Sequence, residues 1–313
     1  MAGQVLNMVE KFVLIDGNAI VHRAYHVMPP LTRSDGTPTG AVQGFFSMII
    51  KIIHDLRPAH IAIAFDSPSP NFRKELFKEY QSQRPAMESD LSPQFGIIQG
   101  ILRKAKIPVY AVEGLEADDI IGTIAEKAKK TGHFVYILTG DRDMLQLVNH
   151  KTTVLAPVKG ISEMVLFDEE KVKEKYGIAP SRFVELKALM GDSSDNYAGV
   201  SGIGPKTASS LISEYGSVDN IYKNISKIKA KNPKLAEKLE NGRDNAKLAH
   251  QLATILTNAP FHYDFSDCDM KNLDIEGFRE ALENYDFKTL PKRLDDVFKK
   301  DVGKIEKTQM KLI

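Results

Sequence analysis

Acidic residues are the side chains of this sequence whose type and spacing best suit chemistry. Oxygen ligands without accompanying Cys or His select hard cations, so a site built from carboxylates would bind Mg²⁺ or Mn²⁺. The candidate ligands follow apolar runs or helical segments and are Asp16, Asp66, Glu116, Asp118, Asp119, Asp141, Asp143, Asp192 and Asp195. The sequence therefore predicts a divalent-ion centre.

One acidic pair taken alone would not carry this prediction. The motif Gly140-Asp141-Arg142-Asp143 follows an apolar run, but an Asp after Gly is more often a turn former or a helix N-cap than a ligand. The recurrence of the arrangement changes the balance. Several strands that all end on carboxylates would crowd like charges and destabilise the fold unless cations neutralised them.

The elements that must position these groups are strands and helices in alternation. Buried strands are predicted at residues 11–15, 60–65, 107–112 and 134–138, and helical spacing of apolar residues at 40–56. Strands separated by helices form right-handed crossovers and a parallel sheet. The fold class is therefore α/β with a mostly parallel central sheet flanked by helices, and its strands deliver their acidic residues to one edge.

A glycine-rich turn follows the last acidic pair. Gly202-Ile203-Gly204-Pro205-Lys206 lies between two helical segments, and its small residues let backbone N–H groups approach a phosphate closely. The next helix N-terminus and Lys206 add positive charge. An ordinary helix-turn-helix corner is the alternative. We favour a clamp for the duplex backbone that ignores base sequence, with Val200 and Ile203 as apolar anchors.

Composition limits the class of protein. The 313 residues can form two domains or one elaborated α/β domain, and the single cysteine, Cys268, excludes an internal disulfide framework. No apolar run is long enough for a bilayer and no secretion signal is evident, so a cytoplasmic location is expected. The net charge of +1 does not exclude DNA, because carboxylates that face bound cations leave the remaining surface positive.

Together these motifs resemble the bacterial 5′-nuclease family, which includes the 5′-3′ exonuclease domain of DNA polymerase I and the phage and eukaryotic flap endonucleases. The resemblance covers residues 12–294. It implies a PIN-like core and a two-metal phosphodiesterase that acts on double-stranded DNA with a 5′ flap, a nick or a 5′ end. Asp16, Asp66, Glu116 and Asp118 would surround the first metal region. Asp141, Asp143, Asp192 and Asp195 would form the second, with Asp119 close by.

The resemblance also assigns DNA contacts. The hairpin would be a helix-three-turn-helix that holds K⁺ through the backbone at Val200 and Ile203. The DNA-binding residues would be Gly202, Ile203, Gly204, Lys206, Thr207 and Arg23.

A helical arch is expected at about residues 70–92. From the residues alone, this stretch predicts a positively charged amphipathic helix bounded by prolines. By resemblance, the arch would admit a single-stranded 5′ end and aim cations at the scissile phosphate. Arg84 matches one such cation, whereas Gln81 stands where relatives usually carry a lysine. Lys78, Arg73 or Arg23 would then substitute for that lysine, or the enzyme would be slower.

The predicted organisation is an α/β nuclease core at 1–190, a helical DNA-binding region at 191–298 and a flexible tail at 299–313. The tail resembles peptides that bind the sliding clamp, with Gln309, Met310, Leu312 and Ile313 as anchors, and a frayed terminus is the alternative. A monomer in the bacterial cytoplasm, associated with the nucleoid, is expected. Two competing hypotheses are a catalytically silent module that binds branched DNA and a related single-domain RNA nuclease.

Overall fold

A six-stranded sheet forms the centre of the molecule in the computed structural model, which describes residues 10–161 and 163–298. Its order is β3-β2-β1-β4-β5-β6, and all neighbouring pairs are parallel except β5 with β6. The strands are β1 (Lys11–Asp16), β2 (His60–Ala64), β3 (Val109–Tyr110), β4 (Phe134–Leu138), β5 (Thr152–Lys159) and β6 (Glu163–Phe167). The predicted mostly parallel sheet is confirmed.

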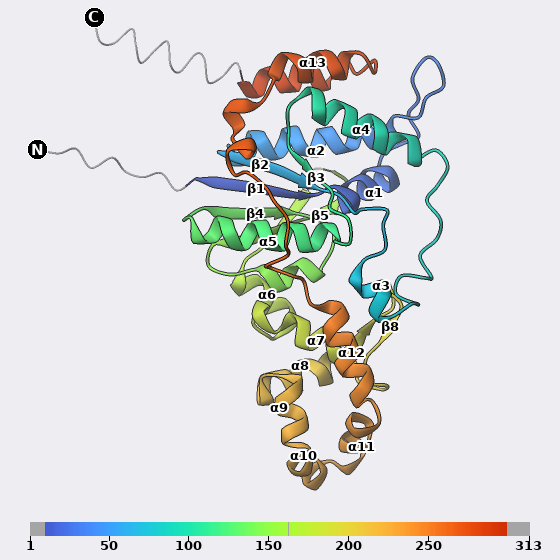
Figure 1. The fold of residues 1–313 in the computed structure, drawn as a ribbon, viewed down its shortest axis with the longest axis vertical. Helices are drawn as coiled ribbons and strands as arrows, with labels where there is room; N and C mark the ends of the chain where they lie inside the picture. The colour runs from blue at the N-terminus through green and yellow to red at the C-terminus, as the bar shows by residue number, and fades with distance from the viewer. Residues whose placement is uncertain (1–9, 162, 299–313) are drawn as a thin grey trace, which may run out of the picture.

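Helices cover both faces of this sheet (Figure 1). Alternate residues of β1 enter different apolar cores: Val13 and Ile15 face one core, and Phe12 and Leu14 face the other. The first core includes residues of α1 (Gly17–Val27), α2 (Gly40–Leu56), α4 (Ser92–Lys104) and α13 (Ile275–Glu283). The second includes α5 (Ala117–Lys130), α6 (Glu169–Tyr176) and α7 (Phe183–Met190). Because both faces are covered, the strands read as continuous apolar runs.

The sheet differs from the prediction at both sides. β3 is only two residues long, and the sequence analysis did not predict β5 or β6. Pro157 within β5 weakens a strand prediction, because proline cannot donate to a ladder. β6 is an edge strand with partly exposed side chains, so it lacks the apolar run of a buried strand.

The segment predicted as an amphipathic helix is helical only at α3 (Phe72–Leu76), where the Asn71 side chain accepts a hydrogen bond from the Lys74 N–H. Turns follow at residues 78–83, and Gln81 has a positive φ of 56°. The Gln81 N–H donates to the Asp195 carbonyl at 2.9 Å. This contact with a distant loop uses a backbone group that a helix would need, so the predicted helix is wrong beyond its first turns.

A narrow helical end extends from the core (Figure 1). It contains the short hairpin β7 (Gly191–Asp192) and β8 (Tyr197–Ala198), and then α8 (Pro205–Tyr215), α9 (Val218–Lys223), α10 (Ile225–Lys231), α11 (Pro233–Asn241) and α12 (Arg243–Ala253). The chain then returns to the core, where α13 packs beside α4. Short 3-10 helices are η1 (Asp143–Leu147), η2 (Pro180–Arg182), η3 (Ser266–Cys268) and η4 (Met270–Asn272). Within the described ranges, no helix is both long and apolar enough to cross a membrane.

Candidate active site

Eight carboxylates from separate parts of the chain line one cavity of about 1030 Å³. They come from the ends of β1 and β2, the start of α5, the turn after β4, and the β7 hairpin with its loop. Parallel strands bring their carboxyl ends to the same sheet edge, which explains the convergence. The eight residues are Asp16, Asp66, Glu116, Asp118, Asp141, Asp143, Asp192 and Asp195.

Asp16 is fixed by its position between a strand and a helix. It caps α1 by accepting a hydrogen bond from the Ala19 N–H at 3.0 Å, and its other oxygen accepts one from the Thr139 hydroxyl at 2.7 Å. Asp66 similarly accepts from the Ala117 N–H at 2.8 Å, which links the end of β2 to the start of α5. Helix N-termini therefore orient these carboxylates and favour their negative charge.

The start of α5 supplies two more acids, Glu116 and Asp118. Burial raises the pKa of Glu116 to about 7, although Arg73 opposes the shift. Burial also raises the pKa of Asp118, with the charge of Asp141 as the next cause. The cost of burying Glu116 thus exceeds what the Arg73 guanidinium at 3.0 Å compensates, and neighbouring carboxylates add to the cost for Asp118. A bound cation would relieve this electrostatic condition.

The second half of the cavity is built around Asp143, Asp192 and Asp195, each of which offers an oxygen within 4.8 Å of the others. The ammonium of Lys187 pairs with Asp143 at 2.6 Å and also with Asp192. Burial nevertheless raises the pKa of Asp143 to about 7. A lysine thus supplies part of the positive charge that this carboxylate group needs.

Asp141 interacts with carboxylates of both groups, with Asp16 and Asp118 and with Asp192 and Asp195. The charge of Asp141 contributes to the raised pKa of Asp16 and of Asp118. The pKa of Asp141 is itself raised, mainly by burial and further by the charges of Asp195 and Asp192. One of its oxygens accepts a hydrogen bond from the Asp143 N–H at 2.8 Å. This position is suited to a ligand shared by two neighbouring ions.

The structure places Asp119 and Arg73 together, outside the cavity lining. Asp119 is fully buried outside the cavity and forms two hydrogen bonds with the Arg73 guanidinium, at 2.8 and 2.9 Å. Arg73 is 2 % exposed and also donates to the carbonyls of Leu252 and Thr254. Arg73 also donates to the Glu116 carboxylate at 3.0 Å, so its charge is engaged by buried carboxylates and is not exposed to solvent.

The other predicted cations are more accessible. Arg84 lines the cavity with a half-exposed side chain and donates to Asp195 at 2.6 Å. Arg23 lines the cavity and donates to the Gly160 carbonyl, whereas Lys78 is exposed and is not part of the lining. Gln81 lines the cavity next to Arg84.

Sequence reasoning missed two residues that shape the site, Lys187 and Tyr80. Lys187 precedes Asp192 by five residues on a helix that is otherwise largely apolar, which was a signal for a lysine held inside the protein. Tyr80 is 3 % exposed, and its hydroxyl lies 3.4 Å from both Glu116 and Asp195. No local pattern indicated that contact, because it joins three distant segments.

The glycine turn adopts a tight hairpin before α8. The Ile203 N–H donates to the Val200 carbonyl at 3.1 Å, and both side chains are buried as anchors. Gly202 has φ of +74°, and a Cβ on Gly199 would lie 2.3 Å from the Gly191 nitrogen, so both positions require glycine. Lys206 and Gly204 are exposed and Thr207 is half-buried, and the Lys238 ammonium contacts the Gly202 carbonyl at 3.2 Å.

The donor set fits Mg²⁺ or Mn²⁺, because the clustered ligand atoms of the cavity are carboxylate oxygens. The positive side chains around them do not fully neutralise their negative charge. An oxygen-lined cavity at the carboxyl edge of a parallel sheet, followed by a glycine hairpin with an exposed lysine, defines the class of metal-ion-dependent nucleases.

Comparison with known proteins identifies the family within that class. Residues 11–177 match the 5′-3′ exonuclease N-terminal resolvase-like domain, and residues 178–276 match the 5′-3′ exonuclease C-terminal SAM fold. A 5′-3′ exonuclease of Aquifex aeolicus is 33% identical over 91% of this chain and 96% of its own length. The chain belongs to the 5′-3′ exonuclease family.

DNA polymerase I of Bacillus subtilis is 40% identical over 92% of this chain. The chain spans only about a third, 32%, of that relative's length. Among solved structures, a phage T5 5′-exonuclease described with bound divalent zinc has a TM-score of 0.63 at 20% identity, covering 93% of this chain and 99% of its own. The catalytic core of Rad2 in complex with a DNA substrate has a TM-score of 0.54 at 17% identity, covering 92% of each chain. These two likenesses support the fold.

Proposed function

We propose that this chain is a divalent-metal-dependent 5′-3′ exonuclease and structure-specific 5′-flap endonuclease. The observation that carries the proposal is the convergence of eight carboxylates from separate segments on one cavity. The Aquifex relative bears the name of such an exonuclease. The proposed substrate is double-stranded DNA with a 5′ flap, a nick or a 5′ end, in primer removal and repair.

The proposed ligands divide into two groups. Asp16, Asp66, Glu116 and Asp118 would hold one Mg²⁺ or Mn²⁺ ion, and Asp143, Asp192 and Asp195 would hold the other, with Asp141 shared. The chemistry supplied by two bound ions is activation of water and neutralisation of charge at the leaving oxygen. Thr139 and the N-termini of α1 and α5 keep the carboxylates oriented, which preserves the site geometry.

Other residues would position the DNA. Arg84 is exposed at the cavity and would exchange its Asp195 partner for the scissile phosphate, with Lys78 nearby in sequence as a further cation. The hairpin with Lys206 would bind duplex phosphates, and Val200 and Ile203 would contribute backbone oxygens to a K⁺ ion.

We also propose that the helical region from residue 191 binds duplex DNA and that residues 1–190 contain the catalytic core. Gln309, Met310, Leu312 and Ile313, the proposed clamp-binding anchors, lie outside the described residues. Deleting residues 309–313 should abolish retention by the sliding clamp while nuclease activity remains.

The experiment that tests the activity is cleavage of an end-labelled 5′-flap duplex with and without Mg²⁺. Asp141→Ala should lower turnover by at least about 100-fold while DNA binding persists, because the cavity loses a central ligand. Asp267→Ala, at an exposed carboxylate outside the cavity, is the control. Binding without Mg²⁺-dependent cleavage by the unmodified chain would instead indicate a silent module, and preferential cleavage of linear single-stranded RNA would indicate an RNA nuclease.

A further inference from the structure

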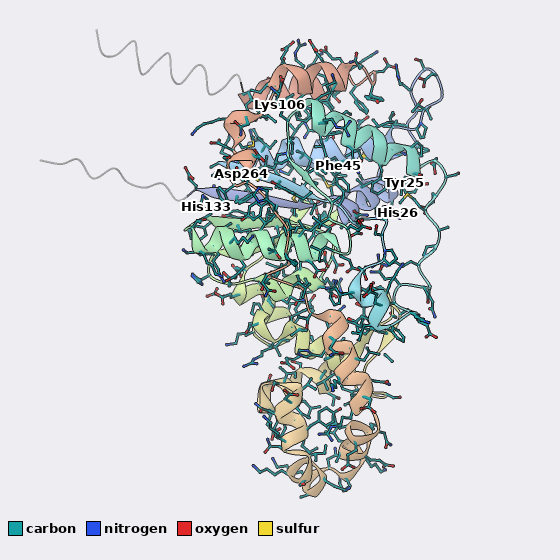
Figure 2. All side chains as sticks on the ribbon, viewed as in Figure 1. Tyr25, His26, Phe45, Lys106, His133 and Asp264 are labelled. Atoms are coloured by element: carbon teal, nitrogen blue, oxygen red, sulfur yellow. The ribbon has the colours of Figure 1, made fainter. Side chains whose placement is uncertain are left out.

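A second set of metal-ligating side chains lies at the opposite sheet edge from the carboxylates. A carboxylate oxygen of Glu10 and ring nitrogens of His60 and His133 lie within 4.8 Å of one another. Glu10 precedes β1, His60 begins β2 and His133 precedes β4, so all three stand at the amino ends of adjacent parallel strands. In Figure 2, His133 is on the far side of the core from His26, which lines the catalytic cavity.

Strand pairing fixes this proximity. In the parallel register, Phe12 is opposite His60 and Lys11 is opposite Phe134, and the Phe134 N–H donates to the Glu10 carbonyl at 3.0 Å. The two imidazole rings are 5.0 Å apart between centroids and meet edge to face. The pairing of adjacent strands therefore fixes the backbone separation of the three residues.

Each histidine has the features of a ligand. The Nδ1 of His133 is 2.9 Å from the Thr131 hydroxyl, a contact that orients the ring, and its Nε2 is 3.3 Å from Glu10. Metal-bound histidines commonly have such a partner on the second nitrogen. His60 is 8 % exposed, and its Nδ1 is buried without a hydrogen-bond partner.

We propose that Glu10, His60 and His133 form a binding site for a borderline transition-metal ion, typified by Zn²⁺, that is separate from the catalytic carboxylates. Two imidazoles and one carboxylate suit Zn²⁺, Co²⁺ or Ni²⁺ and disfavour Mg²⁺. Phe265 packs against both rings, with centroids 4.5 and 4.7 Å away. A bound ion would connect the starts of three strands and would stabilise the core.

The test is calorimetric titration of the full chain with ZnCl₂ in the presence of saturating Mg²⁺. His133→Gln should weaken the affinity of one Zn²⁺-binding event by at least roughly tenfold. In thermal unfolding, the same variant should lose the rise in Tm that Zn²⁺ gives the unmodified chain. His54→Gln is the matched control, because His54 is exposed on α2 and pairs with Asp55 away from the cluster. Nuclease activity with Mg²⁺ should be unchanged in both variants.

Glu10→Gln provides a second variant at an exposed residue whose replacement leaves the core intact. A Co²⁺-loaded chain should show a visible absorption band that His133→Gln removes. The proposal is overturned if no Zn²⁺ binds beyond the carboxylate cavity, or if His133→Gln and Glu10→Gln bind Zn²⁺ as tightly as the unmodified chain. Because these measurements do not involve DNA, their outcome does not depend on whether the chain is a nuclease.

Discussion

At the scale of single residues, the surroundings of a charge decide its role. Arg73 and Arg84 belong to the same predicted arch, yet one is enclosed by Asp119 and the other lies half-exposed at the cavity. Removing one partner of a buried ion pair leaves the other charge without compensation, which is far more costly than losing a solvated charge.

Arg73→Met should therefore lower the free energy of unfolding by about 3–5 kcal/mol, because Asp119 would remain buried without its partner. Lys74→Met, at an exposed position on the same helix, should change it by less than about 0.5 kcal/mol. Urea unfolding of the two variants measures the difference. If Arg73→Met and Lys74→Met are about equally stable and only Arg73→Met loses turnover, Arg73 acts in catalysis and not in stabilising the fold.

Gln81→Lys should raise the rate of flap cleavage. Gln81 lines the cavity beside Arg84, and a cation aimed at the transferred phosphate stabilises the transition state. We expect at least about a fivefold increase in single-turnover rate, equivalent to about 1 kcal/mol. Gln83→Lys, also in the cavity lining, is the control for added charge. An unchanged or lower rate for Gln81→Lys would mean that other cations already compensate.

At the scale of elements, the hairpin before α8 combines buried anchors with an exposed cation. Val200 and Ile203 are buried, whereas Lys206 in the first turn of α8 is exposed. Backbone geometry thus holds the turn rigid while leaving its charge free to contact phosphate.

Lys206→Met should weaken duplex binding equally for all sequences and should reduce the slope of log K against log salt concentration by about 1, because one phosphate contact is lost. Lys292→Met, at an exposed lysine beyond α13 on the core, should leave the slope unchanged. Fluorescence anisotropy over a salt series distinguishes the two. An identical slope in Lys206→Met would exclude this lysine from the phosphate contacts.

At the scale of the whole molecule, the cavity makes stability depend on pH and on metal ions. Burial raises the pKa of Asp16, Glu116 and Asp143 to about 7 each. A raised carboxyl pKa in the folded state contributes stability that is present below the unfolded pKa near 4 and is lost as pH rises through about 7.

The metal-free chain should therefore be less stable at pH 8.5 than at pH 6.5, by on the order of 2 kcal/mol from these groups. Mn²⁺ favours the ionised carboxylates, so its stabilising effect should be larger at pH 8.5. Thermal unfolding in EDTA and in Mn²⁺ at both pH values checks the sign. Metal-free stability that does not fall between the two pH values would show that the carboxylates are already ionised without cations.

Much of this architecture was predictable from local patterns. The apolar runs at residues 11–15, 60–65 and 134–138 become β1, β2 and β4, and the acids that follow them meet at one edge because the strands are parallel. β5 and β6 were not predictable, because Pro157 and half-exposed side chains obscure their strand pattern. The helix predicted after Leu76 was wrong for another reason, because the Asp195 carbonyl in a distant loop accepts a hydrogen bond from the Gln81 N–H.

The sequence by itself determined the parallel strands β1, β2 and β4, the convergence of the acids that follow them and the glycine hairpin, because strand ends and turn residues are properties of neighbouring positions. Only the tertiary structure decided that Asp119 pairs with Arg73, that Lys187 neutralises Asp143 and Asp192, and that His60 meets His133. Those pairings join residues far apart in the chain. Their energies depend on burial and on which opposite charge lies within reach, and neither quantity is encoded in local spacing.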